Sequence, residues 1–462
     1  MYYALSEKTV LGIISELANN SDFIGLQNVF KDLSKGCENI SCLIALIEAG
    51  IDPAANDNDA IKCASFYGYT DIVRLLLTND AVDPSAENNY AIKYASRFGH
   101  TDIVRLLLEN DTVDPSAENN YAIRYASSNG HIEIVRLLLK NSKVDPSAEN
   151  NYAIKDASQY GYTNVVKLLL ENDTVDPSAE DNDAIKCASL NGYTDIVRLL
   201  LTNDAVDPSA ENNYAIRYAS QYGHTNVVKL LLENNTVDPS AEKNYAIRYA
   251  STYGHIEVVR LLLANSKVDP SADYNYAIIF ASEIGHTEVV KLLLANDKVD
   301  PSGSDNYAIR HASERGCTEV VRLLLENDRI NPASIDNYAI TFASKYGHTE
   351  VVKLLLANDR VDPSADRNLS FRYACERGHI EIVKLLLAND RVDPSANNNS
   401  PICNACTYGY IEIVKLLLAN PKVDPSAQDN LPIKLAYKYN YKNIVALLND
   451  KVDISKINLH NE

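Results

Sequence analysis

Hydrophobic residues follow a helical period in the short segment between Thr101 and Glu109. Ile103, Val104 and the run Leu106–Leu108 gather on one wide face, while polar residues occupy the opposite face. An apolar stripe with this spacing is typical of a helix that packs against the rest of a protein. The pattern therefore predicts an amphipathic helix over residues 101–109.

A second apolar pattern predicts another helix immediately before this one. Ile92 and Ala95 stand three residues apart and would share one helical face. Asn89 is expected to cap the start of this helix at Tyr90, because an asparagine side chain can accept a hydrogen bond from an early backbone N–H. Gly99 is expected to end the helix, since glycine enters the left-handed region without steric cost. The two patterns together predict a pair of short helices.

The segment that follows the helix pair is predicted to form a tight turn. Asn110 is expected to stop the second helix. The sequence Asp114-Pro115-Ser116-Ala117 then fits a type I turn, with Asp at the first position and Pro at the second.

The whole unit is repeated along the chain with a period of 31 residues. Thirteen of the sixteen prolines fall in one phase of this period, and an asparagine equivalent to Asn89 recurs in all thirteen copies. A helix pair of this size cannot bury its own apolar face, whereas stacked copies share a continuous core. We therefore expect an all-α solenoid of about thirteen repeats over residues 26–448. A leader or cap at 1–25 would precede it, and a tail at 449–462 would follow it.

Charge and cysteine content narrow the classes of partner and compartment. The chain has 43 basic and 62 acidic residues, a net charge of −19, which disfavours nucleic-acid backbones and anionic membrane surfaces as partners. No apolar run reaches the length of a membrane span, and the first residues lack the pattern of a signal peptide. Eight scattered cysteines fit a reducing compartment. We expect a cytoplasmic monomer.

The repeated order of residues resembles the ankyrin repeat. The segment A-I-x-x-A-S-x-x-G-H-x-x-V-V-x-L-L-L is similar to the family core T-P-L-H-x-A-A-x-x-G-H-x-x-V-V-x-L-L-L, and Gly99, His100, Val104 and Leu106–Leu108 match it directly. The resemblance covers about nine-tenths of the chain. It implies antiparallel helix pairs, a projecting loop or hairpin between repeats, and first helices that line a concave side.

The sequence departs from the family pattern in two ways, and each departure leads to an expectation about the structure. The unit has 31 residues instead of the usual 33 or so, and we therefore expect shortened turns in place of full β-hairpins. The segment Tyr90-Ala91-Ile92-Lys93 replaces the T-P-L-H tetrad, so the hydrogen bonds that Thr and His provide in the family must come from other residues. Short repeats marked by Asp-Pro resemble those of ankyrin proteins from large DNA viruses, which would place the protein in the host cytoplasm.

The resemblance implies a non-enzymatic scaffold that presents an elongated concave surface to protein partners. Two alternatives stay open, namely a substrate-recruiting adaptor of a ubiquitin ligase and a regulatory subunit of an enzyme. The sequence shows no nucleophile with a base, phosphate loop or metal set outside the repeats. We expect no catalytic, cofactor-binding or metal-binding residues.

Three features could suggest chemistry, and each has a structural explanation. A histidine follows the glycine in many repeats, but Tyr162 and other tyrosines replace it, and a metal ligand could not be exchanged in this way. Acidic turn residues such as Asp114 and Glu118 supply too few oxygens for calcium. Cys403 and Cys406 form a CxxC pair, but the second pair that a zinc site needs is missing.

Three rows of side chains are candidates for a surface. The equivalents of Arg105 follow an acidic residue such as Asp102 and are expected to form a solvated, self-neutralised face. The equivalents of Lys93 either form a patch for a partner or bridge to acidic turn residues of a neighbouring repeat. The equivalents of Tyr90 either pack against the preceding turn or contribute to a binding surface.

The turn residues change along the chain more than the exposed second-helix positions do. Up to Glu242 the turns are almost uniform, and beyond it they diverge at Asp273-Tyr274, Gly303-Ser304, Ser334-Ile335, Asp366-Arg367 and Asn397-Asn398. The basic second-helix positions keep their charge over the same span. We therefore expect a specific partner to contact the first helices and turns between about Ser271 and Asn399.

Overall fold

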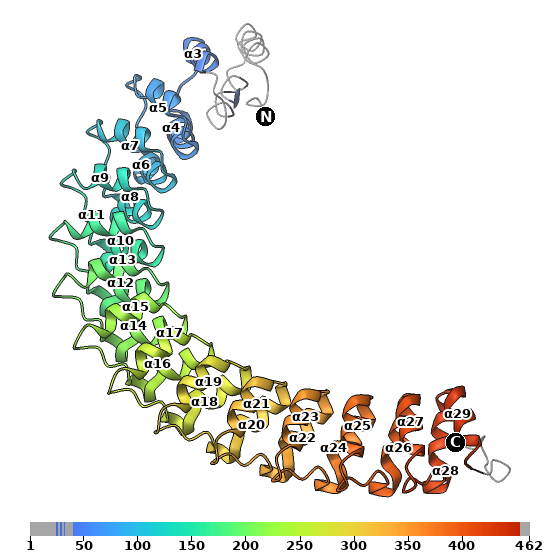
Figure 1. Ribbon diagram of the computed structural model, residues 1–462. Coiled ribbons are helices and arrows are strands. Elements are labelled where there is room, and N and C mark those ends of the chain that lie inside the picture. Colours follow the sequence, from blue (N-terminus) through green and yellow to red (C-terminus); the bar gives the residue numbers. More distant parts are fainter. Residues whose placement is uncertain (1–24, 26–27, 30–31, 33–39, 453–462) are drawn as a thin grey trace. The chain divides into compact units, whose positions relative to one another are not determined.

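The computed structural model describes residues 25, 28–29, 32 and 40–452. Over these residues the chain forms helices and no strand (Figure 1). It divides into two units, one of residues 1–219 and 226–238 and the other of residues 220–225 and 239–462. Within each unit, first and second helices of successive repeats alternate along the chain and pack in two layers. The predicted all-α solenoid, with shortened turns in place of full β-hairpins, is therefore confirmed.

The described helices begin with α3 at Ile40–Glu48. The first helices of the repeats are α4 (Ala55–Tyr67), α6 (Ala86–Phe98), α8 (Ala117–Ser128), α10 (Ala148–Gln159), α12 (Ala179–Leu190), α14 (Ala210–Gln221), α16 (Ala241–Thr252), α18 (Ala272–Ile284), α20 (Gly303–Arg315), α22 (Ser334–Tyr346), α24 (Ala365–Arg377), α26 (Ala396–Tyr408) and α28 (Ala427–Lys438). The second helices are α5 (Thr70–Leu76), α7 (Thr101–Leu108), α9 (Ile132–Leu138), α11 (Thr163–Leu170), α13 (Thr194–Leu200), α15 (Thr225–Leu232), α17 (Ile256–Leu263), α19 (Thr287–Leu294), α21 (Thr318–Leu325), α23 (Thr349–Leu356), α25 (Ile380–Leu387), α27 (Ile411–Leu418) and α29 (Lys442–Asn449).

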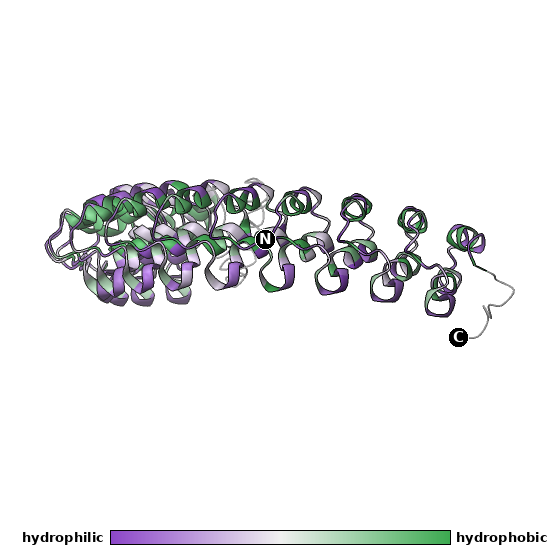
Figure 2. Ribbon diagram, turned by 60° about the horizontal axis from the view of Figure 1, so that its bottom comes forward, coloured by the Kyte–Doolittle hydropathy of each residue, from purple (hydrophilic) through white to green (hydrophobic). Residues whose placement is uncertain are grey.

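The second helices carry the most hydrophobic part of the core. In α7, Ile103, Val104 and Leu107 are fully buried, whereas Arg105 is exposed. Figure 2 shows the same contrast within each unit, where green residues are concentrated in the layer of second helices. The predicted helix over residues 101–109 is confirmed to within one residue at its end.

The first helices bury smaller side chains and end at a glycine. Ala91, Ile92 and Ala95 of α6 are buried, and Gly99 follows the helix with a φ of 85°. A side chain at Gly99 would also collide with the next repeat, because a Cβ atom there would lie 2.7 Å from Cε1 of His131. Glycine is therefore required at this position for two reasons. The backbone has a positive φ, and the His131 ring packs over the residue too closely for a side chain.

The predicted type I turn is also present. Ala117 N–H donates to the carbonyl of Asp114 at 3.3 Å, and Ser116 has the φ of −88° and ψ of −3° of the third turn position. The Asp114 carboxylate accepts hydrogen bonds from the Ser116 N–H at 3.0 Å and hydroxyl at 2.6 Å. The hydroxyl bond is the main reason why the pKa of Asp114 lies below its usual value.

The predicted N-cap at Asn89 is wrong. Glu87, Asn88 and Asn89 all have left-handed backbone angles, with φ of 49°, 53° and 62°, and the right-handed part of α6 begins only at Tyr90. The Asn89 side chain accepts the N–H of Asp114 in the next repeat at 2.7 Å instead of capping its own helix. Equivalent bonds recur from Asn58–Asp83 to Asn399–Asp424, at 2.6 to 2.8 Å. This asparagine therefore links each repeat to the next.

Candidate protein-binding surface

The first helices and the turns before them present three sets of side chains. We call the three left-handed residues before each first helix, such as Glu87–Asn89, the turn tip. The basic row consists of Lys93 and its equivalents. The aromatic row consists of the equivalents of Tyr90 and Tyr94.

The basic row bridges neighbouring repeats in several places. Lys93 is buried, and its Nζ lies 2.6 Å from Oε1 of Glu118 in the next turn tip. Equivalent ion pairs join Lys62 to Glu87, Lys186 to Glu211 and Arg248 to Asp273. Of the two interpretations of this row, the structure therefore supports bridging between repeats. The sequence signal for it was an acidic residue 25 positions after each of these bases.

Arginines of the basic row also fold back onto their own turn tip. Arg124 donates to the carbonyl of Glu118 at 3.1 Å, and Arg217 donates to the carbonyl of Glu211 at 3.0 Å. The carbonyls of the left-handed segment lie outside the regular hydrogen bonding of the helix, and these arginines supply donors for them. The basic row therefore stabilises the turn tips as well as the contacts between them.

The bridging ion pair is lost after Asp273. Ile279 and Ser304 take the positions of the base and the acid in the next repeat, and Ile279 is buried. Arg310 donates to the backbone carbonyls of Asp305 and Ser304 in its own turn tip. The turn tips from α20 onward thus differ in chemistry from the earlier ones.

The aromatic row consists of rings that contact one another within and between repeats. Tyr90 and Tyr94 have centroids 4.2 Å apart, and Tyr94 lies 5.7 Å from Tyr121 of the next repeat. In the second unit the contacts pass from Tyr245 through Tyr249, Tyr276, Phe280, Tyr307, His311, Tyr338 and Phe342 to Tyr373. Burial raises the pKa of Tyr90 and Tyr121. These rings therefore contribute to packing between repeats, and their edges remain partly accessible.

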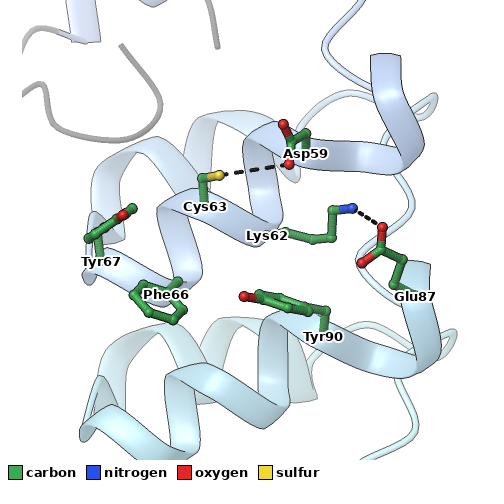
Figure 3. Close-up of a pocket in the computed structure, with 7 residues that line it drawn as sticks. All are labelled: Asp59, Lys62, Cys63, Phe66, Tyr67, Glu87 and Tyr90. Carbon is green, nitrogen blue, oxygen red and sulfur yellow. Dashed lines mark hydrogen bonds and ion pairs between the residues drawn. The ribbon is translucent and has the colours of Figure 1, made fainter. Parts of the chain in front are cut away.

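A pocket opens where two rings of the aromatic row are missing. Asp59 and Cys63 take the positions of Tyr90 and Tyr94 in α4, and the resulting pocket has a volume of about 310 Å³. Figure 3 shows Phe66, Tyr67 and Tyr90 below and beside the Lys62–Glu87 ion pair, with the Cys63 thiol directed at Asp59. The lining combines charged groups with exposed ring faces, and it is Asp59, Lys62, Cys63, Phe66, Tyr67, Glu87 and Tyr90.

The recurring histidines tie one repeat to the preceding one. His131 Nε2 donates to the carbonyl of Arg97 at the end of the preceding first helix, at 3.1 Å. Burial lowers the pKa of His131, which favours the neutral ring. No group of three or more His, Cys, Asp or Glu side chains in the described part of the chain could hold a metal ion. The structural role predicted for these histidines agrees with these contacts.

The CxxC cysteines are part of the core of α26. Cys403 and Cys406 are both buried. Burial raises the pKa of Cys403 to about 11 and also raises that of Cys406. A thiol in such surroundings stays protonated at neutral pH and is a poor nucleophile.

The exposed side of the second helices is self-neutralised as predicted in seven repeats, whereas Asn164 and Asn226 take the acidic position in α11 and α15. Lys384 Nζ lies 2.7 Å from Oε1 of Glu381, three residues earlier, and both side chains are more than half exposed. Equivalent pairs occur at Arg136–Glu133, Arg260–Glu257, Lys291–Glu288, Arg322–Glu319, Lys353–Glu350 and Lys415–Glu412. Pairs with this exposure contribute little to stability, and they leave this face without a strong local charge.

The fold and these surfaces define a helical-repeat solenoid. A family model described as Ankyrin repeats (3 copies) matches residues 33–119, 92–183, 123–212, 184–273, 247–336, 330–398 and 371–458. The chain belongs to the ankyrin-repeat family. No curated protein matches it. Among the residues that the structure describes, every helix is too short or too polar to cross a membrane.

Proposed function

We propose that this ankyrin-repeat protein is a non-enzymatic scaffold that binds protein partners through its turn tips and first helices. The observation that supports this most strongly is the contrast between the two sides of each repeat. The second helices expose short ion pairs such as Lys384–Glu381. The first helices and turn tips expose partly buried rings and varied turn residues, which are the kinds of side chain that protein interfaces favour.

The proposal also covers the domain boundaries, the oligomeric state and the cellular location of the protein. The repeat array would occupy residues 26–448, with a leader at 1–25 and a tail at 449–462, and much of both ends lies outside the described residues. The protein would act as a cytoplasmic monomer, in the host cytoplasm if it is viral. A role as an adaptor of a ubiquitin ligase would need a recruiting segment at one of these ends.

Photo-crosslinking in cells tests the scaffold function. One variant carries a photoreactive phenylalanine analogue at Tyr338 in the aromatic row, and a matched variant carries it at Lys353, which is exposed on a second helix. We expect a protein adduct from position 338 that is absent from position 353, and direct binding when that protein is purified and titrated with the full chain. Adducts at position 353 alone, or no protein adduct from either position, would reject the proposal.

A further inference from the structure

The turn tips impose an unusual demand on the sequence. All three residues of each tip have positive φ, for example Asn397, Asn398 and Asn399 with 52°, 56° and 59°. Residues other than glycine are disfavoured in this region, and Asn and Asp tolerate it best. Asparagine or aspartate accordingly occupies the second tip position in most repeats.

Two turn tips of the second unit carry residues that this backbone disfavours. Tyr274, the second residue of the tip of α18, has a φ of 61° and is 82% exposed. Ile335, the first residue of the tip of α22, has a φ of 48° and is 51% exposed. A β-branched residue at positive φ is an outlier. Neither side chain is part of the core, so packing within the repeat does not explain the choice of these residues.

The charged residues of the tips of α18, α20 and α22 are all acidic, although Lys243 and Arg367 occupy the tips on either side and Arg310 donates to two backbone carbonyls of the α20 tip. Asp305 and Asp336 occupy the second positions of the tips of α20 and α22, and both are exposed. Neither forms an ion pair with any residue that the structure describes, whereas earlier tip carboxylates such as Glu118 are bound by the basic row. The α20 tip between Tyr274 and Ile335, and the α22 tip that holds Ile335 itself, therefore each offer a carboxylate that a cationic partner could neutralise.

We infer that the turn tips of α18, α20 and α22 form a docking surface for an extended segment of a partner protein. Tyr274 and Ile335 would contact two apolar side chains of that segment. Asp305, in the tip between them, and Asp336, beside Ile335, would bind its lysine or arginine side chains. This inference rests on the proposed scaffold function, and it adds which kinds of side chain the partner segment carries. Backbone strain at exposed apolar residues is consistent with selection for binding, because it lowers the stability of the free protein without adding to its core.

The geometry limits the spacing of the two apolar residues in the partner. Neighbouring repeats pack their helices about 10 Å apart, so Tyr274 and Ile335, two repeats apart, are separated by roughly 20 Å. An extended chain advances about 3.3 Å per residue. The apolar residues of the partner are therefore expected about six residues apart.

Fluorescent peptides and the purified full chain test the assignment. The peptides carry two leucines separated by roughly four to eight residues, with lysines between them. Two control series replace the lysines by glutamate or the leucines by serine. The tip variant combines Tyr274→Asn with Ile335→Asn. The matched control combines Asn88→Ser with Glu149→Asn, at the equivalent tip positions two repeats apart in the first unit.

We expect at least one lysine peptide to bind the parent chain roughly tenfold more tightly than the tip variant. The matched control should bind it as the parent does, and the glutamate and serine peptides should bind weakly. If no lysine peptide of any spacing prefers the parent over the tip variant, or if glutamate peptides bind equally well, the assignment is overturned.

Two further results would separate this inference from the scaffold function. A crosslinked partner that binds the tip variant as well as the parent would overturn the docking surface while the scaffold function stands. Self-association of the parent, lost in the tip variant on sedimentation, would assign the tips to a second copy and also overturn the inference.

Discussion

At each turn tip, one asparagine is suited to two conditions at once. Asn89 adopts a φ of 62°, which asparagine tolerates better than most residues, and its side-chain oxygen accepts the N–H of Asp114 in the next repeat. The side chain is almost fully buried. A replacement that keeps only one of these properties would disturb either the turn tip or the contact between repeats.

Replacing Asn89 by alanine should lower the free energy of unfolding by about 1–3 kcal/mol more than replacing Asn88, because it leaves the half-buried Asp114 N–H without its partner. Asn88 is the matched control, since it has a similar φ of 53° but is exposed. Urea denaturation of the two single variants measures the difference. Equal midpoints would show that the hydrogen bond between repeats contributes nothing.

Replacing Tyr274 by asparagine should raise the free energy of unfolding by about 1 kcal/mol, because the left-handed backbone no longer carries a bulky side chain. The reverse change, Asn398→Tyr, puts a tyrosine into the equivalent position of α26 and should lower stability by a similar amount. Thermal unfolding of both variants tests this. Shifts in the same direction for the two variants would contradict the strain at Tyr274.

At the scale of the element, the end of the first helix of a repeat is fixed by the repeat that follows. Gly347 ends α22 with a φ of 83°, and a Cβ atom there would lie 2.7 Å from Cε1 of His379. His379 Nε2 is itself bonded to the carbonyl of Lys345 at 3.0 Å. The ring could not move away from a new side chain without losing this bond. The helix end and the contact between repeats are therefore coupled.

Gly347→Ala should destabilise the protein strongly in the parent, and less in a His379→Ala background, where the colliding ring is absent. The alanine retains the strain of a positive φ in both backgrounds. We expect a coupling free energy of about 1 kcal/mol or more from the double-mutant cycle, measured by urea denaturation. Additive effects would mean that only the backbone conformation requires glycine.

At the scale of the whole molecule, the same contacts are repeated many times and their effects accumulate. The histidine contact is one example, with bonds at His100, His131, His255, His286, His348 and His379. Burial lowers the pKa of His131 and His255 below the value of 6.5 for an unperturbed histidine. The unfolded chain then binds protons more readily than the folded protein as the pH falls below 6.5.

These two histidines should therefore make the protein less stable on acidification. Their contribution is fully present above the unfolded pKa of 6.5 and is lost as the pH falls through the folded values. The variant His131→Tyr/His255→Tyr should lose less stability between pH 7.5 and 5.5 than the parent, because Tyr162 occupies the same position against Gly130 without titrating in this range. Urea midpoints at the two pH values give the comparison. An unchanged or larger loss in the variant would contradict the burial effect.

The sequence by itself determined the features that depend on local pattern. The apolar spacing of Ile103, Val104 and Leu107 defined a helix and its buried face, and Gly99 defined where the preceding helix ends. Asp114 and Pro115 defined the turn. Each of these depends on residues a few positions apart, where backbone sterics and helical periodicity are decisive. The divergent turns at Tyr274 and Ile335 were also visible in the sequence, but their left-handed backbone was not.

Only the tertiary structure decided which side chains meet between repeats. Lys93 pairs with Glu118 and Asn89 with Asp114, each 25 residues away, and His131 bonds to a carbonyl 34 residues back. The repeat period is compatible with many such pairings. It gives the position of a residue within its own repeat, but not the residue of the next repeat that it contacts. The left-handed backbone of the turn tip could not be predicted from the sequence either. Residue preferences disfavour three consecutive left-handed residues, and the bonds to the next repeat hold them in that conformation.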